Sequence, residues 1–101
     1  MLLARVVGSV WATQKTPSLE GLRLQVLRQV DLSLKEGSGS VIAVDAVGAG
    51  IGDLVLYATG SSARQTPVTE NRPVDAVIMA VVDAFDVDGT VVFKKSGKGD
   101  H

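Results

Sequence analysis

Apolar and polar residues alternate along much of the chain, a period-2 pattern typical of β-strands. Residues 2–12 place apolar or small side chains at every second position. Residues 22–32 repeat the pattern with a break in phase near Arg28, where we expect a bulge or a strand end. Further strands are predicted at 41–45, 54–59, 74–85 and 90–94. The pattern therefore predicts an all-β domain.

Clusters of Gly, Ser, Pro and Asp separate these segments and mark the predicted turns. Residues 14–21 are expected to form a loop and residues 36–40, with the sequence EGSGS, a turn. Residues 88–89 are Asp-Gly, which favours a hairpin turn into the last strand. Short strands joined by tight loops are typical of a small sandwich or barrel, and Ala4, Gly8 and Ala12 on one face of the first strand leave room for the curvature of a barrel.

Residues 60–65 are the single helical candidate. Ser62 could cap the helix while Gln65, three residues later, reaches back as in a capping box. Pro67 follows closely and limits the helix to one or two turns. The predicted fold is thus an all-β small barrel with one short helix and a C-terminal hairpin.

Two predicted strands, residues 54–58 and 76–82, are apolar on both faces. In an antiparallel barrel one face of each strand normally meets water. Such strands are covered either by a loop or helix of the same chain or by another subunit. Because the chain has little helix to offer, the second alternative is favoured, and we expect a homo-oligomer.

The length of 101 residues fits one domain, here residues 1–95, followed by a tail at 96–101 rich in Gly, Lys and Ser that we expect to be disordered. Ten basic and eleven acidic residues give a net charge of −1, without the basic excess that nucleic-acid binding requires. The longest apolar run is far shorter than a membrane span, and neither a signal peptide nor any cysteine is found. These features favour a cytoplasmic protein without nucleic-acid or membrane partners.

The sequence VGAGIGD at residues 47–53 carries three alternating glycines, Gly48, Gly50 and Gly52, which could belong to a phosphate-binding loop. A dinucleotide-binding fingerprint requires a helix directly afterwards, whereas a strand is predicted here. A P-loop would need Lys followed by Ser or Thr after the last glycine. We therefore interpret the segment as a tight connection between strands, in which some glycines adopt unusual φ angles.

No catalytic or metal-binding constellation is evident, and no cofactor is expected. His101 is the single histidine and lies at the end of the chain, and the spacing of the aspartates matches no metal-binding loop. Ser61 and Ser62 lack a histidine base and a nucleophile elbow, so capping is their simpler role. Arg64, on the short helix, could pair with a carboxylate of a neighbouring chain or remain a solvated surface arginine.

Six short strings of sequence, in order and at compatible spacing, together resemble the CcmL/EutN family of bacterial microcompartment vertex proteins. The similarity extends from residue 1 to about residue 95. The strings lie at residues 3–10, 13–21, 43–50, 60–64, 73–76 and 81–83.

This resemblance implies a small five-stranded OB-like β-barrel with one short helix and a C-terminal β-hairpin. It also implies a non-enzymatic shell component that assembles into a pentamer, with a hexamer as an alternative, and caps the vertices of a protein shell beside hexameric facet proteins. The Gly-Ser-Ser-Ala-Arg string is slightly more similar to catabolic compartments, or metabolosomes, than to carboxysomes. We expect Arg64, Asp75, Ser61 and Ser62 at subunit contacts or in assembly, together with the three glycines Gly48, Gly50 and Gly52. A different class of function, a small OB-like barrel that binds single-stranded nucleic acid or a small anionic ligand, is the alternative.

Overall fold

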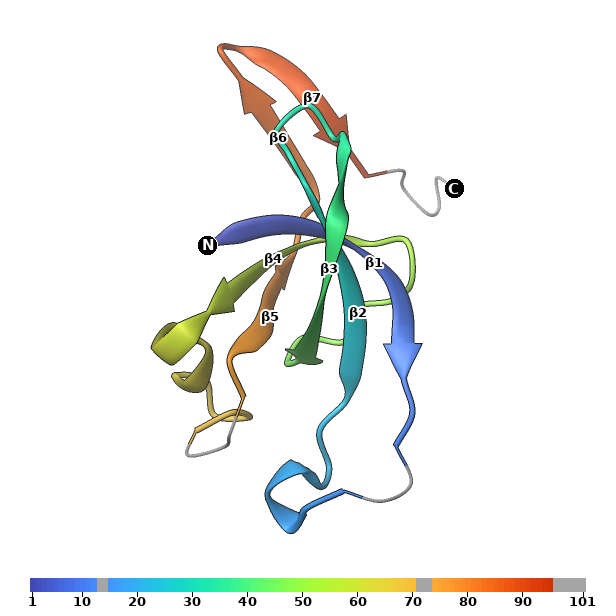
Figure 1. Cartoon of the computed structure of the whole chain (residues 1–101). Coiled ribbons are helices and arrows are strands. Elements are labelled where there is room, and N and C mark those ends of the chain that lie inside the picture. The colour runs from blue at the N-terminus through green and yellow to red at the C-terminus, as the bar shows by residue number, and fades with distance from the viewer. Residues whose placement is uncertain (13–14, 71–73, 96–101) are drawn as a thin grey trace.

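The computed structural model describes residues 1–12, 15–70 and 74–95, so the tail expected at 96–101 lies outside the described residues. Seven strands and two short 3-10 helices follow one another along the chain (Figure 1). They are β1 (Leu2–Val10), η1 (Pro17–Leu19), β2 (Leu24–Val30), β3 (Glu36–Asp45), β4 (Leu54–Thr59), η2 (Gly60–Arg64), β5 (Ala76–Val81), β6 (Ala84–Val87) and β7 (Thr90–Lys94).

Five strands form a closed barrel in the order β1-β2-β3-β5-β4, which confirms the predicted fold class. All neighbours are antiparallel except β3 and β5, which pair in parallel over two residues. Because β5 lies between β3 and β4, the segment that connects β3 to β4 must cross one end of the barrel. Register shifts occur between Val6 and Gly8 and between Arg28 and Val30, the second at the predicted break in phase.

The predicted strand at 74–85 is in fact two strands, which is a correction with consequences for shape. β5 ends at Val81 and β6 begins at Ala84, where the chain leaves the barrel and pairs with β7 in a separate two-stranded sheet. The predicted hairpin turn is present, with positive φ at both Asp88 and Gly89. Figure 1 shows the β6–β7 hairpin and the turn between β2 and β3 extending from the same end of the barrel.

The predicted turn at 36–40 is wrong, because these residues form the first half of β3. The reversal comes earlier, where the Asp31 carboxylate accepts hydrogen bonds from the backbone N–H groups of Ser33 and Lys35 and from the Ser33 hydroxyl. Leu34 adopts a φ of 69° within this turn. A strand is held by backbone pairing, so a Gly-Ser run can enter one when the neighbouring strand supplies the partners.

The interior of the barrel is filled by residues from all five strands. Its largest members are Tyr57 and Leu27, with Val6, Val55 and Ile78 beside them. A second cluster places Ala63 of η2 against Ala58 and Val77, so the short helix covers part of the other face of β4 and β5. The expectation that another subunit covers these strands is therefore wrong for their buried part, whereas Met79 stays 36% exposed.

The short helix at 60–64 is present but is of the 3-10 type, and η1 is a second helix that the sequence analysis did not predict. The predicted capping box is absent: Thr59 occupies the N-cap and makes no side-chain capping hydrogen bond. Ser62 lies inside the helix, where its carbonyl accepts from the Gln65 N–H. No helix within the described residues is long and apolar enough to cross a membrane.

Candidate functional site

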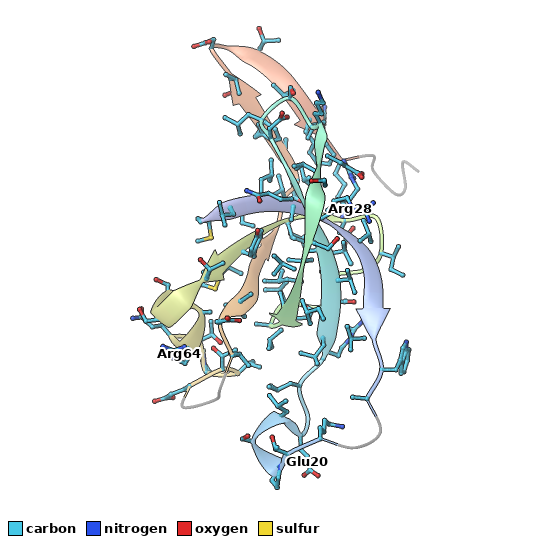
Figure 2. All side chains as sticks on the ribbon, in the orientation of Figure 1. Glu20, Arg28 and Arg64 are labelled. Carbon is cyan, nitrogen blue, oxygen red and sulfur yellow. The ribbon has the colours of Figure 1, made fainter. Side chains whose placement is uncertain are left out.

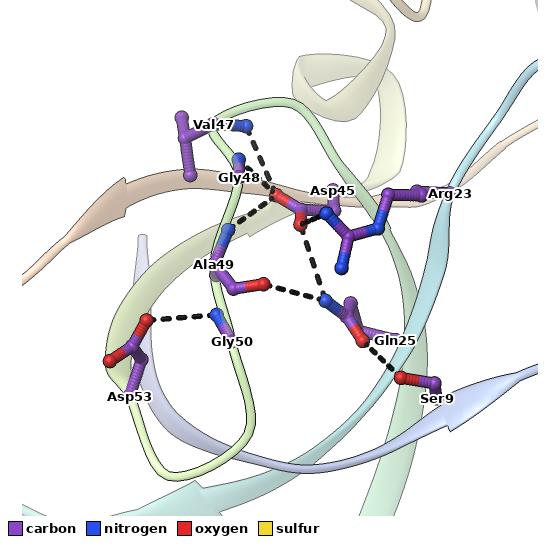
Figure 3. Close-up of polar contacts among 9 residues, drawn as sticks. All are labelled: Ser9, Arg23, Gln25, Asp45, Val47, Gly48, Ala49, Gly50 and Asp53. Carbon is purple, nitrogen blue, oxygen red and sulfur yellow. Dashed lines mark hydrogen bonds and ion pairs between the residues drawn. The ribbon is translucent and has the colours of Figure 1, made fainter.

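The segment between β3 and β4, residues 46–53, is held in place by the side chain of Asp45 at the end of β3. One oxygen of this carboxylate, Oδ1, accepts hydrogen bonds from the backbone N–H groups of Val47, Gly48 and Ala49 at 3.0, 2.9 and 3.2 Å (Figure 3). The Asp45 side chain is fully buried. We call residues 46–53 the glycine loop.

The second half of the glycine loop is fixed from two sides. Asp53 Oδ2 accepts a hydrogen bond from the Gly50 N–H at 2.8 Å. The Gly52 N–H donates to the Val6 carbonyl at 2.8 Å and the Val6 N–H donates to the Asp53 carbonyl at 2.9 Å, so the loop pairs with β1. Arg5 Nη1 adds a hydrogen bond to the Gly52 carbonyl at 2.9 Å. The loop is thus tied to the barrel along most of its length.

Gln25 of β2 joins the two halves of this network. Its side-chain Nε2 donates to the Ala49 carbonyl at 2.8 Å and to Asp45 Oδ2 at 3.2 Å, and its Oε1 accepts from the Ser9 hydroxyl at 2.9 Å (Figure 3). Gln25 is 1% exposed. A buried amide with all three partners satisfied stabilises one arrangement, because any other would leave polar groups unpaired.

The charge of Asp45 is maintained by hydrogen bonding. Burial by itself raises the pKa of this carboxyl group. The hydrogen bonds from the backbone N–H groups of Val47, Ala49 and Gly48 and from the Gln25 amide lower the pKa by more than burial raises it, so the pKa lies below the usual 3.8. Arg23 Nη1 lies 3.7 Å from Asp45 Oδ2, but its side chain is 66% exposed and solvent weakens this pair. Hydrogen bonds from the loop therefore hold the anion.

This geometry answers the question that the glycines raise. Three successive N–H groups that converge on one oxygen form an anion-binding nest, the arrangement that phosphate loops use. In this chain the carboxylate of Asp45 occupies the nest, and the Asp53 carboxylate accepts from the next N–H. The interpretation as a tight connection agrees with this geometry, since an incoming phosphate would have to displace two of the protein's own anions.

Two of the three glycines need their lack of a side chain. Gly48 has φ 85° and Gly52 φ 95°, in the left-handed region where other residues are strained, which confirms the predicted unusual φ angles at these positions. Gly50 has no positive φ, and an added Cβ would meet only Asp53 Oδ2, at 3.9 Å. Glycine is therefore required by the backbone conformation at positions 48 and 52 but not at position 50.

The other predicted assembly residues gather at the end of β4 and the start of β5. Ser61, Ser62 and Arg64 are exposed on η2, and Arg64 Nη1 donates to the Val74 carbonyl at 3.1 Å. The neighbouring Asp75 is exposed, and its carbonyl accepts from the Gly60 N–H at 3.0 Å. Figure 2 shows Arg64 beside η2, far from Arg28 on β2. We call Ser61, Ser62, Arg64 and Asp75 the η2 surface.

The structure brings the predicted residues into two groups rather than one. The glycine loop precedes β4 and the η2 surface follows it, so the two groups lie at opposite ends of a six-residue strand, about 20 Å apart. Neither group contains an assembled set of catalytic side chains. Among the described residues, no cluster of three His, Cys, Asp or Glu could hold a metal ion.

Sequence reasoning missed the roles of Gln25 and Asp45. The alternation in β2 indicated that Leu24 and Val26 face the core, but Gln25 and Leu27 are buried and Leu24 and Val26 only half-buried. The signal that could have located Asp45 is its place directly before a glycine-rich turn, because Asp side chains often accept from backbone N–H groups two or three residues later. Gln25 gave no comparable signal.

The fold and the site thus define a small closed β-barrel in which a buried polar network of Asp45 and Gln25 supports the glycine loop. The family described as "Ethanolamine utilisation protein EutN/carboxysome" matches residues 1–83. The chain belongs to this EutN/CcmL family.

The sequence is similar to those of known relatives over most of its length. The carboxysome shell vertex protein CcmL of Gloeobacter violaceus is 38% identical over 95 residues, covering 94% of this chain and 95% of the relative. The bacterial microcompartment shell vertex protein PduN of Salmonella typhimurium is 46% identical over 89 residues, covering 84% and 98%. Both carboxysome proteins and proteins of other microcompartments are therefore similar to this chain.

Solved structures are similar to the same extent. The Gloeobacter violaceus CcmL structure has a TM-score of 0.92 at 37% identity and covers 96% of this chain and 100% of its own. The GrpN pentameric microcompartment shell protein from Rhodospirillum rubrum has a TM-score of 0.79 at 36% identity, covering 86% and 99%. These similarities support the shell interpretation and not the alternative of a nucleic-acid or anion-binding barrel.

The Asp45 network predicts a specific pH dependence of stability. Because the folded-state pKa lies below 3.8, the charged carboxylate contributes stability above about pH 3.8, and this contribution is lost as the pH falls through the folded-state pKa. We expect Asp45→Asn to lower the free energy of unfolding at pH 7 by about 1–3 kcal/mol. In denaturant titrations the difference from the parent should shrink below about pH 3.8.

The exposed residue Asp83 provides the matched control, since Asp83→Asn removes the same charge without touching the loop. A loss of stability in Asp83→Asn equal to that in Asp45→Asn, or a difference that grows with acidity, would contradict the assigned role of Asp45.

The glycine loop offers a second internal comparison. Gly52→Ala places a Cβ at φ 95° and should destabilise the fold by about 1–2 kcal/mol, although the space around it is open. Gly50→Ala lies two residues away without a positive φ and should change stability by less than about 0.5 kcal/mol. Thermal melts of the two variants at matched concentration measure the difference, and equal effects would disprove the assignment.

Proposed function

We propose that this chain is a structural vertex subunit of a bacterial microcompartment shell, in which five copies close into a ring. The observation that carries the proposal is the agreement of its barrel with the pentameric shell protein GrpN, at a TM-score of 0.79, together with the agreement with CcmL at 0.92. The function of such a subunit is its shape, because the ring has to fit a five-fold position among the facets.

The absence of enzymatic activity belongs to the same proposal. Asp45, Gln25 and the loop backbone satisfy one another in a buried polar network, and the buried Thr69 is hydrogen-bonded to Thr66. The alternative of an anionic ligand at the glycine loop is disfavoured for the same reason. Single-stranded nucleic acid is disfavoured by the net charge of −1.

The proposed setting is the bacterial cytoplasm, with hexameric facet proteins of the shell as neighbours of the ring. Relatives from carboxysomes and from other microcompartments match the chain about equally well, so these similarities leave the predicted preference for a metabolosome untested. The compartment type is best settled by which facet proteins bind the purified ring.

Light scattering tests the ring directly. The chain has a mass of 10.5 kDa, so five subunits should give about 52 kDa, and six about 63 kDa, in size-exclusion chromatography with multi-angle detection. We expect the five-subunit mass at micromolar concentration. A mass near 10.5 kDa under these conditions would refute the proposal.

Arg64 is proposed as a subunit contact on the η2 surface. The structure gives it one hydrogen bond, to the Val74 carbonyl, and a guanidinium has five donors, so it can also bind a neighbour's carboxylate. Arg64→Ala should raise the concentration at which half of the rings dissociate by about tenfold, with a larger effect at low salt.

Arg28→Ala is the matched control, because Arg28 lies on β2 and pairs with Glu36 of its own chain at 3.5 Å. Equilibrium dilution of both variants, followed by light scattering at low and high salt, separates the two roles. Unchanged ring stability in Arg64→Ala would remove Arg64 from the contacts while leaving the ring itself intact.

A further inference from the structure

A groove of about 630 Å³ lies where the β6–β7 hairpin, the start of β1 and the turn after β2 meet. It is predominantly apolar, and several of its side chains are exposed, among them Leu32 at 61% and Leu2 at 37%. Other apolar residues in its lining are Leu3, Leu56, Phe85 and Val87. A continuous apolar groove of this kind is typical of an interaction surface.

The hairpin that forms one wall of this groove is weakly supported by its own chain. β6 and β7 pair only with each other, and an isolated two-stranded sheet is marginally stable in water. Phe85 and Phe93 stack across it with ring centroids 6.4 Å apart, and Lys95 Nζ lies 3.8 Å from Asp53 Oδ1 at its base. A partner seated in the groove would support the hairpin from its open side.

A second exposed apolar feature lies at the tip of the glycine loop, where Ile51 is 70% exposed. Its backbone is fixed on both sides, by the bonds of Gly50 to Asp53 and of Gly52 to Val6. A side chain presented by a rigid loop loses little conformational entropy on binding. Trp11 is also exposed, at 89%, but it adjoins residues outside the described part of the chain.

The charges around the two features are complementary. The groove is lined by the carboxylates of Asp31 and Asp86 and by the amino group of Met1, so its net charge is negative. The surface around Ile51 contains Arg5, Lys94 and Lys95 against the single carboxylate of Asp53, so its net charge is positive. Opposite net charges favour an encounter between these two surfaces and disfavour the encounter of either with itself.

The positions of the two features suit a ring. In Figure 1 the glycine loop lies to the right of the barrel, while the N-terminus, whose first residues line the groove, lies to the left. A ring of identical subunits requires two different surfaces on each subunit, one that receives and one that inserts. The groove and the Ile51 tip meet this requirement.

We propose that Ile51 of one subunit inserts into the groove between β1 and the β6–β7 hairpin of the next copy of this chain. The positive charge around Ile51 and the negative charge of the groove guide this contact. This proposal rests on the proposed function and names the contact that closes the ring. It also gives the Asp45 network a purpose, since that network fixes the position of the inserting loop.

Two single variants test the contact in the full chain. Ile51→Asp changes the inserting residue and Leu32→Asp the groove, and both positions are exposed enough to tolerate a charge without loss of the fold. Each variant should raise the half-dissociation concentration of the ring by about 30-fold or more, the effect of losing a central contact. Trp11→Asp, at an exposed apolar residue outside both surfaces, is the control and should form rings like the parent.

Mixing the two variants gives a sharper test. An Ile51→Asp subunit keeps an intact groove and a Leu32→Asp subunit keeps an intact Ile51, so one good contact can form between them. We expect each variant alone to be monomeric at a concentration where the equimolar mixture forms dimers of about 21 kDa. Far-UV circular dichroism and the melting temperature of each monomer confirm that the fold is kept.

The outcomes separate this inference from the proposed function. If the parent chain forms rings and both variants form them equally well, the contact is refuted and the vertex function stands. A mixture that stays monomeric would show that Ile51 and the groove do not meet, and would also refute it. Intact rings that lose binding to a facet protein would assign the groove to that protein and overturn the inference, whereas a parent that is itself monomeric would refute the proposed function.

Discussion

The carboxylate of Asp45 is the interaction on which the rest of this structure depends. The barrel order places β5 between β3 and β4, so the chain has to cross one end of the barrel after Asp45. A crossing segment cannot use the hydrogen bonds of a neighbouring strand along its whole length, and its backbone N–H groups need other partners. One buried anion satisfies three of them and allows a tight crossing.

The cost of this solution explains its surroundings. A buried carboxylate without partners would take up a proton or destabilise the fold, so it requires several donors at once. Gln25 supplies one of them from β2 and is itself held by Ser9 of β1. Strands β1, β2 and β3 and the glycine loop are therefore linked through this polar network. The network stabilises the fold only when all of its members are hydrogen-bonded.

The sequence predicted the parts of the fold that follow from local pattern. Alternation located β1 and β2, short apolar runs between turn residues located β3, β4 and β5, and Asp88 with Gly89 located the hairpin turn, because these features depend on neighbours in the chain. Sequence reasoning failed where the position of a residue depends on a partner far away in the chain. Gln25 occupies the core because Asp45 and Ala49, twenty or more residues away, need a donor there.

The same distinction applies to residues 36–40 and to the candidate site. Gly and Ser in that segment suggested a turn, but the segment pairs with β2 and forms part of β3. The turn is stabilised by Asp31 instead. Arg64, Ser61, Ser62 and Asp75 are exposed as expected of surface residues, yet surface position alone does not identify a contact. The groove could not be predicted at all, since it exists only where the separate hairpin approaches the barrel.

Ring size is a question of angle, and the structure suggests where the angle is set. Successive subunits rotated by about 72° close a ring of five and those rotated by about 60° a ring of six, so a difference of about 12° separates the two outcomes. A flexible contact could not distinguish them. If the inserting loop determines how neighbours meet, its position has to be fixed to a fraction of its own size, and the several hydrogen bonds centred on Asp45 and Asp53 provide that rigidity. A network that would be costly as a mere connection between strands is then explained by the geometry of the assembly.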